Sequence, residues 1–142
     1  MAQSWQFWAV LAAIFAALTA IFAKVGIENI DSDYATFIRT LVIIGVLGLM
    51  LTALGKWQSP ATISMKSWIF LVLSGLATGV SWLAYFRALK LGDASRVAPV
   101  DKLSIILVAI FGVVFLGEKL ALQNWLGVML IFCGVILLAT KF

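Results

Sequence analysis

The chain has 142 residues, of which 64% are hydrophobic and 11% charged, with a formal net charge of +4 and no histidine. Soluble domains are roughly half apolar and about a quarter charged, so this composition excludes an ordinary soluble fold. The positive charge forms no basic run or face, which also excludes nucleic-acid binding. The composition predicts an all-α integral membrane protein that contacts membrane lipid.

Five helices are expected to cross the membrane, and in chain order they are 6–23, 34–55, 67–87, 96–117 and 122–140. Crossing the hydrocarbon takes about 20 helical residues. The uncharged runs 40–55 and 103–117 are shorter, so the second and fourth helices span only if they include Arg39, or Asp101 and Lys102. Four helices with a re-entrant segment is the alternative interpretation. The chain 1–142 is predicted to form a single transmembrane domain with short loops.

The interfacial residues agree with five crossings. We call the membrane side that holds Met1 side A and the opposite side B. Side A then holds Trp5, Trp8, Trp57, Trp68 and Trp125 near the interface, where tryptophan is enriched. Side B carries Lys24, Arg39, Arg87, Lys90, Arg96, Lys102 and Lys141, against Lys56, Lys66 and Lys119 on side A. The positive-inside rule favours an N-out/C-in orientation, and dual topology stays open. We expect a multi-pass protein of the cell inner (plasma) membrane.

The third helix carries a row of hydroxyl side chains. Ser74, Thr78, Ser81 and Tyr85 recur at a spacing that lines one face of an α-helix, with Trp82 beside them. Such hydroxyls serve either as packing contacts between membrane helices or as the polar wall of a water-accessible cavity. The candidate substrate path consists of Ser74, Thr78, Ser81, Trp82, Tyr85 and Ser104.

Away from the end residues of the expected helices, three charges fall inside them: Arg39 in the second helix, and Asp101 and Lys102 in the fourth, just after Pro99. Arg39 and Asp101 lie at similar depth from side B, and a lone charge at the bilayer centre costs at least a few kcal/mol. Three interpretations follow: an ion pair between Arg39 and Asp101, a role in substrate or ion binding, or side chains that extend to the headgroups. Pro99 is tolerated if the helix starts close before it and otherwise kinks the helix at these charges.

Enzyme signatures are absent from the sequence. It has no histidine, a single cysteine, no glycine-rich phosphate loop and no pair of acids within the spans. We therefore expect no catalytic residues, no metal, no cofactor and no enzyme activity.

The run YFRALKLGDASRVAPVDKLSIILVAIFGVVFLGEKL, followed by NWLGVMLIFCGVILL, resembles the EamA domain of the drug/metabolite transporter superfamily. The resemblance extends over residues from about 68 to 140 and more loosely over the preceding part. The common form of this family has two inverted repeats of five helices, and this chain looks like one repeat. The first helix contains no acid, unlike the related four-helix multidrug group, which argues against proton-coupled export of cationic drugs.

The resemblance implies a half-size secondary transporter of small metabolites or drug-like molecules that works as an antiparallel homodimer. The alternative is a non-transporting membrane subunit that assembles with a partner protein.

Overall fold

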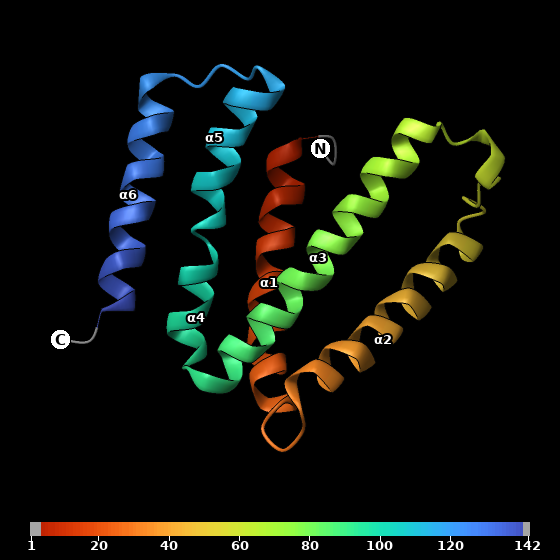
Figure 1. Ribbon diagram of the computed structural model, residues 1–142, viewed down its shortest axis with the longest axis horizontal. Coiled ribbons are helices and arrows are strands. Elements are labelled where there is room, and N and C mark those ends of the chain that lie inside the picture. Colours follow the sequence, from red (N-terminus) through yellow and green to blue (C-terminus); the bar gives the residue numbers. More distant parts are fainter. Residues whose placement is uncertain (1–3, 141–142) are drawn as a thin grey trace. The chain divides into compact units, whose positions relative to one another are not determined.

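The computed structural model describes residues 4–140, and within that range it contains helices and connecting loops but no strands. The all-α fold class is therefore confirmed. The helices are α1 (Trp5–Gly26), α2 (Ser32–Ala53), the short 3₁₀ helix η1 (Pro60–Thr62), α3 (Met65–Leu91), α4 (Ala94–Asp101), α5 (Ser104–Leu116) and α6 (Leu122–Ala139) (Figure 1).

Five helical segments in residues 4–140 are long and apolar enough to cross a bilayer, and α4 with α5 make up one of them, Ala94–Leu116. Their ends differ from the expected ones because local hydrogen bonds set them. The Asp31 carboxylate accepts from the backbone N–H groups of Asp33 at 2.9 Å and Tyr34 at 3.1 Å, so α2 begins at Ser32. An N-cap of this kind satisfies donors that the first turn leaves unpaired.

The fourth span is interrupted between α4 and α5, at Lys102 and Leu103 (Figure 1). Pro99 lies inside α4 and has no N–H to donate. After it the backbone bonds tighten to a three-residue spacing, with Lys102 N–H donating to the Pro99 carbonyl and Leu103 N–H to the Val100 carbonyl, both at 3.0 Å. The span therefore carries a break where the sequence expects one continuous helix.

The end of α5 is defined by a glycine in the left-handed region. Gly117 has φ of 68°, which an L side chain rarely adopts, and the Glu118 N–H turns back to the Gly112 carbonyl at 3.1 Å. The Glu118 carboxylate then folds over Gly112, where an added Cβ would lie 2.6 Å from one of its oxygens. The turn thus closes onto the helix that it ends.

The described residues form two compact units, Phe22–Lys90 and the described parts of 1–21 and 91–142. In the first unit, α2 and α3 run antiparallel; in the second, α4 and α5 pack along α6 (Figure 1). Few large side chains are fully buried, among them Ile27 and Leu89, and most large apolar residues are exposed. In a membrane these exposed side chains face lipid or another protein.

Candidate functional site

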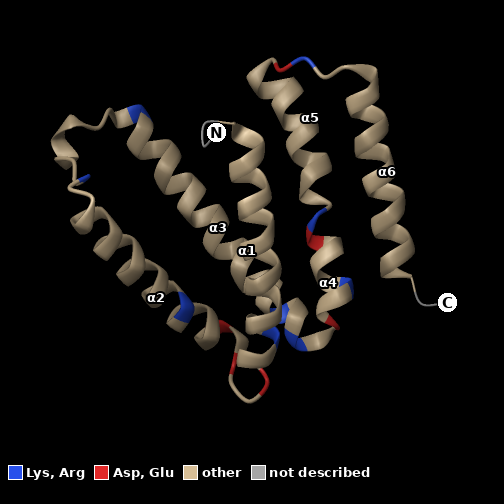
Figure 2. Cartoon of the chain, turned by 180° about the vertical axis from the view of Figure 1, so that it is seen from behind, with Lys and Arg blue, Asp and Glu red and all other residues tan. Residues whose placement is uncertain are grey.

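Charged residues of the unit Phe22–Lys90 gather where α1 ends, α2 begins and α3 ends (Figure 2). Two lysines in the last turns of their helices bind the carbonyls of another segment. Lys24 Nζ, from α1, donates to the Leu89 carbonyl at 2.6 Å. Lys90 Nζ, from α3, donates to the Ile27 carbonyl at 2.9 Å and to the Ile30 carbonyl. Each lysine therefore caps carbonyls at or just beyond the end of the other's helix, where cations are favourable.

An ion pair joins the start of α2 to the same end of α3. Arg87 donates through Nε to one Asp33 oxygen at 3.0 Å and through a terminal nitrogen to the other at 2.5 Å. Both side chains are largely exposed, at 64% for Arg87 and 40% for Asp33. The contact joins the first turn of α2 to the last turns of α3.

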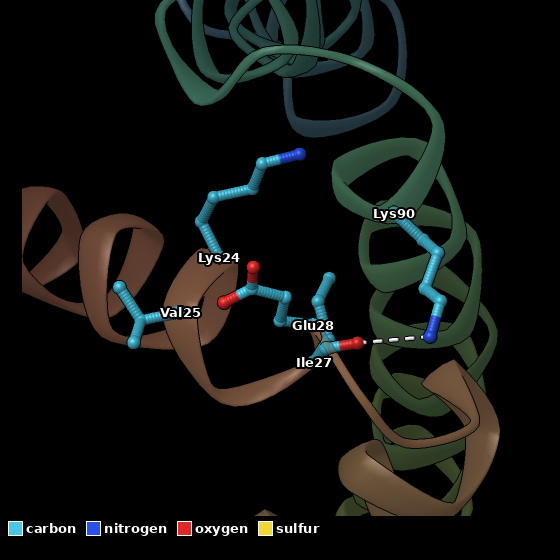
Figure 3. Close-up of a pocket in the computed structure, with 5 residues that line it drawn as sticks. All are labelled: Lys24, Val25, Ile27, Glu28 and Lys90. Atoms are coloured by element: carbon cyan, nitrogen blue, oxygen red, sulfur yellow. Dashed lines mark hydrogen bonds between the residues drawn. The ribbon is translucent and has the colours of Figure 1, made fainter.

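A half-open cavity of about 340 Å³ lies beside this cluster, lined by Lys24, Val25, Ile27, Glu28 and Lys90 (Figure 3). The Lys90 ammonium points to the Ile27 carbonyl, so part of its donor capacity is already used. Because carbonyls engage both lysines and Glu28 adds a negative charge, the cavity has no uniform charge that would select one class of ligand.

Further into the span, Arg39 of α2 packs against two aromatic rings of α3. Its guanidinium carbon lies 4.2 Å from the ring centroid of Trp82 and 5.3 Å from that of Phe86. The rings attract the cation through their faces. Within Phe22–Lys90 no carboxylate forms an ion pair with Arg39; Asp33 of that unit pairs with Arg87.

The other two charges expected inside a span pair with each other. Lys102 Nζ lies 3.1 Å from an Asp101 carboxylate oxygen, at the break between α4 and α5. Because Arg39 and Asp101 belong to different units of the chain, an ion pair between these two residues stays a prediction.

The hydroxyl row of α3 is exposed at Ser74, Thr78 and Ser81 in the single chain. The Thr78 hydroxyl donates to the Ser74 carbonyl at 2.8 Å, a bond within the helix. Tyr85 is half-buried and meets the Phe86 ring edge-on, with 6.4 Å between centroids. Trp82 connects this row to Arg39, whereas Ser104 begins α5 in the other unit. The substrate path through these residues remains a prediction.

Sequence reasoning did not identify the lysine caps or the contact between Arg87 and Asp33. A signal for the caps was present, since lysine in the last helical turn commonly binds terminal carbonyls. The acceptors, however, lie on another segment of the chain, and spacing within one helix does not reveal them.

Five apolar spans with hydroxyl and charged side chains inside them are the features of a multi-pass membrane transport protein. The chain belongs to the EamA-like transporter family, whose profile matches residues 3–140. The resemblance to this family in the drug/metabolite transporter superfamily is therefore confirmed. The family and two of the relatives below are named as transporters and not as enzymes.

Three relatives illustrate the similarity. An uncharacterized transporter in the cobO 3′ region of Sinorhizobium sp. is 68% identical over 98% of this chain and 99% of its own length. The uncharacterized transporter YxxF of Bacillus subtilis is 30% identical over 92% of this chain and 40% of its own. A probable 4-amino-4-deoxy-L-arabinose-phosphoundecaprenol flippase subunit, ArnE of Hamiltonella defensa, is 33% identical over 58% of this chain and 73% of its own. No solved structure matches.

Proposed function

We propose that the chain is a half-size secondary transporter that moves small metabolites or drug-like molecules as an antiparallel homodimer. The observation that carries the proposal is the number of spans, which is five. Because five is odd, two such sets of helices in one chain lie inverted relative to each other in the membrane. Transporters of inverted-repeat architecture place their site between two such units. The Bacillus relative matches this chain over only 40% of its length, so it has room for a second unit of this size. A second copy of this chain, inserted the other way, supplies the missing half.

The surface of α3 supports contact with another chain. Gly75 and Gly79 lie one turn apart, and apart from their chain neighbours and the adjoining backbone of α3, no atom of the described residues lies within 4 Å of the position that a Cβ would occupy at either residue. Exposed small residues let membrane helices approach closely. The exposed face of α3 therefore accommodates a second helix.

Orientation of the chain in the membrane tests the antiparallel dimer. In a Cys133→Ala background, single cysteines replace Ser59, in the loop between α2 and α3, or Thr140, after α6. Intact cells are treated with a membrane-impermeant maleimide. We expect partial labelling at both positions because both orientations are present. Labelling at Ser59 alone would establish a single N-out/C-in orientation and contradict the antiparallel dimer.

The substrate path is tested in the same background with cysteines at Ser74, Thr78 and Ser81. We expect these positions to react with a water-soluble thiol reagent faster than cysteines at Leu73 and Leu76, which are exposed on the same helix. Equal rates at all five positions would assign the hydroxyl row to helix packing.

Transport itself is tested with proteoliposomes that contain only this chain. They are incubated with a defined mixture of small organic acids, amines and sugars, and the internal contents are measured by mass spectrometry. We expect at least one solute to enter faster than in protein-free vesicles.

A second candidate function is a membrane subunit that transports only with a partner protein. The observation that favours it is the similarity to a relative named as a flippase subunit. Proteoliposomes of the isolated chain that take up no solute would support this function over the homodimer.

A further inference from the structure

Arg39 keeps a full positive charge inside a spanning helix. It lies seven residues beyond Ser32, the first residue of α2, which corresponds to about 10 Å along the helix axis. The side chain is half-buried, so it is held against the protein and does not extend freely towards the headgroups. A charge at this depth is costly unless it has a partner or a function.

The aromatic rings hold the guanidinium without neutralising it. Trp82 and Phe86 lie at 4.2 and 5.3 Å from its carbon atom. A ring attracts the cation through its face, but the five N–H donors lie at the edge of the guanidinium plane and need an acceptor. The two rings therefore fix the position of Arg39 and leave its fork of donors available.

Two acids at or within the spans already have cations of their own. Asp33 binds Arg87, and Asp101, the acid of the fourth span, binds Lys102 at 3.1 Å. These two pairs are each neutral as a unit, and within Phe22–Lys90 no carboxylate forms an ion pair with Arg39, so Arg39 contributes an uncompensated positive charge to that unit. A site with this charge attracts an anion and repels a cation.

We propose that Arg39 binds the acidic group of the transported molecule, so that the substrate is a small organic anion bearing a carboxylate or a phosphate. This inference rests on the transport function proposed above and names its substrate class. A guanidinium matches both groups because its parallel N–H donors bind two oxygens at once. The face of Trp82 holds the guanidinium in place. The hydroxyls of Ser81 and of the other residues in its row lie on the same helix and are available to bind the remaining part of the substrate.

The inference is tested with purified full-length protein in detergent and four probes of similar size: benzoate, benzyl phosphate, benzyl alcohol and benzylamine. Binding is measured from the rise of the thermal unfolding midpoint with probe concentration. We expect the two anions to bind and the alcohol and amine to bind at least tenfold more weakly. Arg39→Gln should weaken anion binding by about tenfold or more, because a charge-assisted hydrogen bond is lost.

Matched variants separate this role from structural effects. Lys66→Gln removes an exposed cation at the opposite end of α3 and should leave the affinity for the anions unchanged. If Arg39→Gln does not yield folded protein, Arg39→Lys decides, because it keeps the charge but loses the bidentate fork and should lower anion affinity severalfold. Asp101→Asn should leave anion binding unchanged; stronger binding in that variant would show that Asp101 neutralises Arg39 and would overturn the inference.

Three other results would also overturn it: equal binding of all four probes, undiminished anion binding in Arg39→Gln, or no binding of any probe. The proteoliposome experiment tests the transport function separately. Uptake of amines or sugars that is unaffected by Arg39→Gln would reject the anionic substrate and leave transport by this chain intact.

Discussion

The environment of Arg39 shows how this protein retains a guanidinium inside a span. Two aromatic faces replace water above the plane of the group, and they come from one stretch of α3 in which Trp82 and Phe86 lie one turn apart. This arrangement makes a specific energetic prediction for the pair formed by Arg39 and Trp82.

We expect a coupling free energy of about 1 kcal/mol between Arg39 and Trp82, because cation–π contacts contribute roughly 0.5–2 kcal/mol. It is measured by a double-mutant cycle of Arg39→Gln and Trp82→Leu on the free energy of unfolding in detergent. Trp68→Leu is the control: Trp68 lies near the opposite end of α3, where its indole donates to the Pro60 carbonyl, and it should show no coupling to Arg39. Additive effects of the first pair would mean that the ring contact contributes nothing to stability.

For these individual residues, the sequence predicts their positions in the spans but not the residues that they contact. Arg39 was predicted as an intramembrane charge and Trp82 as part of the hydroxyl-bearing helix, and each prediction follows from one helix alone. Their contact depends on the register between α2 and α3, which the contact of Arg87 with Asp33 helps to set. Helical spacing carries no information on that register.

Among the elements, the fourth span departs most from the sequence prediction. Its hydropathy and length predict one helix over 96–117, and the five-span count that depends on it is confirmed. The sequence predicts a kink near Lys102 and Leu103 only under one condition, namely that the helix begins well before Pro99. The helix begins at Ala94, five residues before the proline, and the kinked alternative is the one that the structure shows.

We expect Pro99→Ala to extend the regular helix through the break, because it restores a backbone donor and removes the clash of the ring with the preceding turn. Backbone hydrogen exchange, measured by mass spectrometry in detergent, should then slow for peptides that cover residues 100–106. Val108→Ala, a substitution within α5, is the control and should leave exchange of these peptides unchanged. Unaltered exchange in Pro99→Ala would assign the break to the charged pair of Asp101 and Lys102.

For the whole molecule, the charge distribution predicts how readily its orientation changes. Side A carries Lys56, Lys66 and Lys119 against seven Lys and Arg residues on side B, of which Lys141 lies outside the described residues. Lys24 and Lys90 count towards side B although their ammonium groups bind carbonyls, since the charge itself is kept. In proteins with short loops, a few such charges decide the orientation.

A lysine added at Ser59 should therefore shift the population towards the orientation with side A in the cytoplasm. In the Thr140→Cys, Cys133→Ala background, we expect Ser59→Lys to increase labelling of position 140 from outside intact cells. Ser59→Gln, which adds no charge, should not change it. An unchanged labelled fraction in Ser59→Lys would indicate that the orientation is fixed by features other than loop charge.

The lysine caps have a consequence for the order in which the chain assembles during synthesis. The bonds from Lys24 to Leu89 and from Lys90 to Ile27 connect residues 65 and 63 positions apart, so they cannot form until α3 has been made. Once α3 has been made, the donors and acceptors of both contacts are present, because all of them lie within Phe22–Lys90. A nascent chain whose third span has entered the membrane can therefore form both lysine–carbonyl contacts before any residue of α4, α5 or α6 leaves the ribosome. The unit Phe22–Lys90 can thus complete its own lysine–carbonyl contacts before the later helices are inserted.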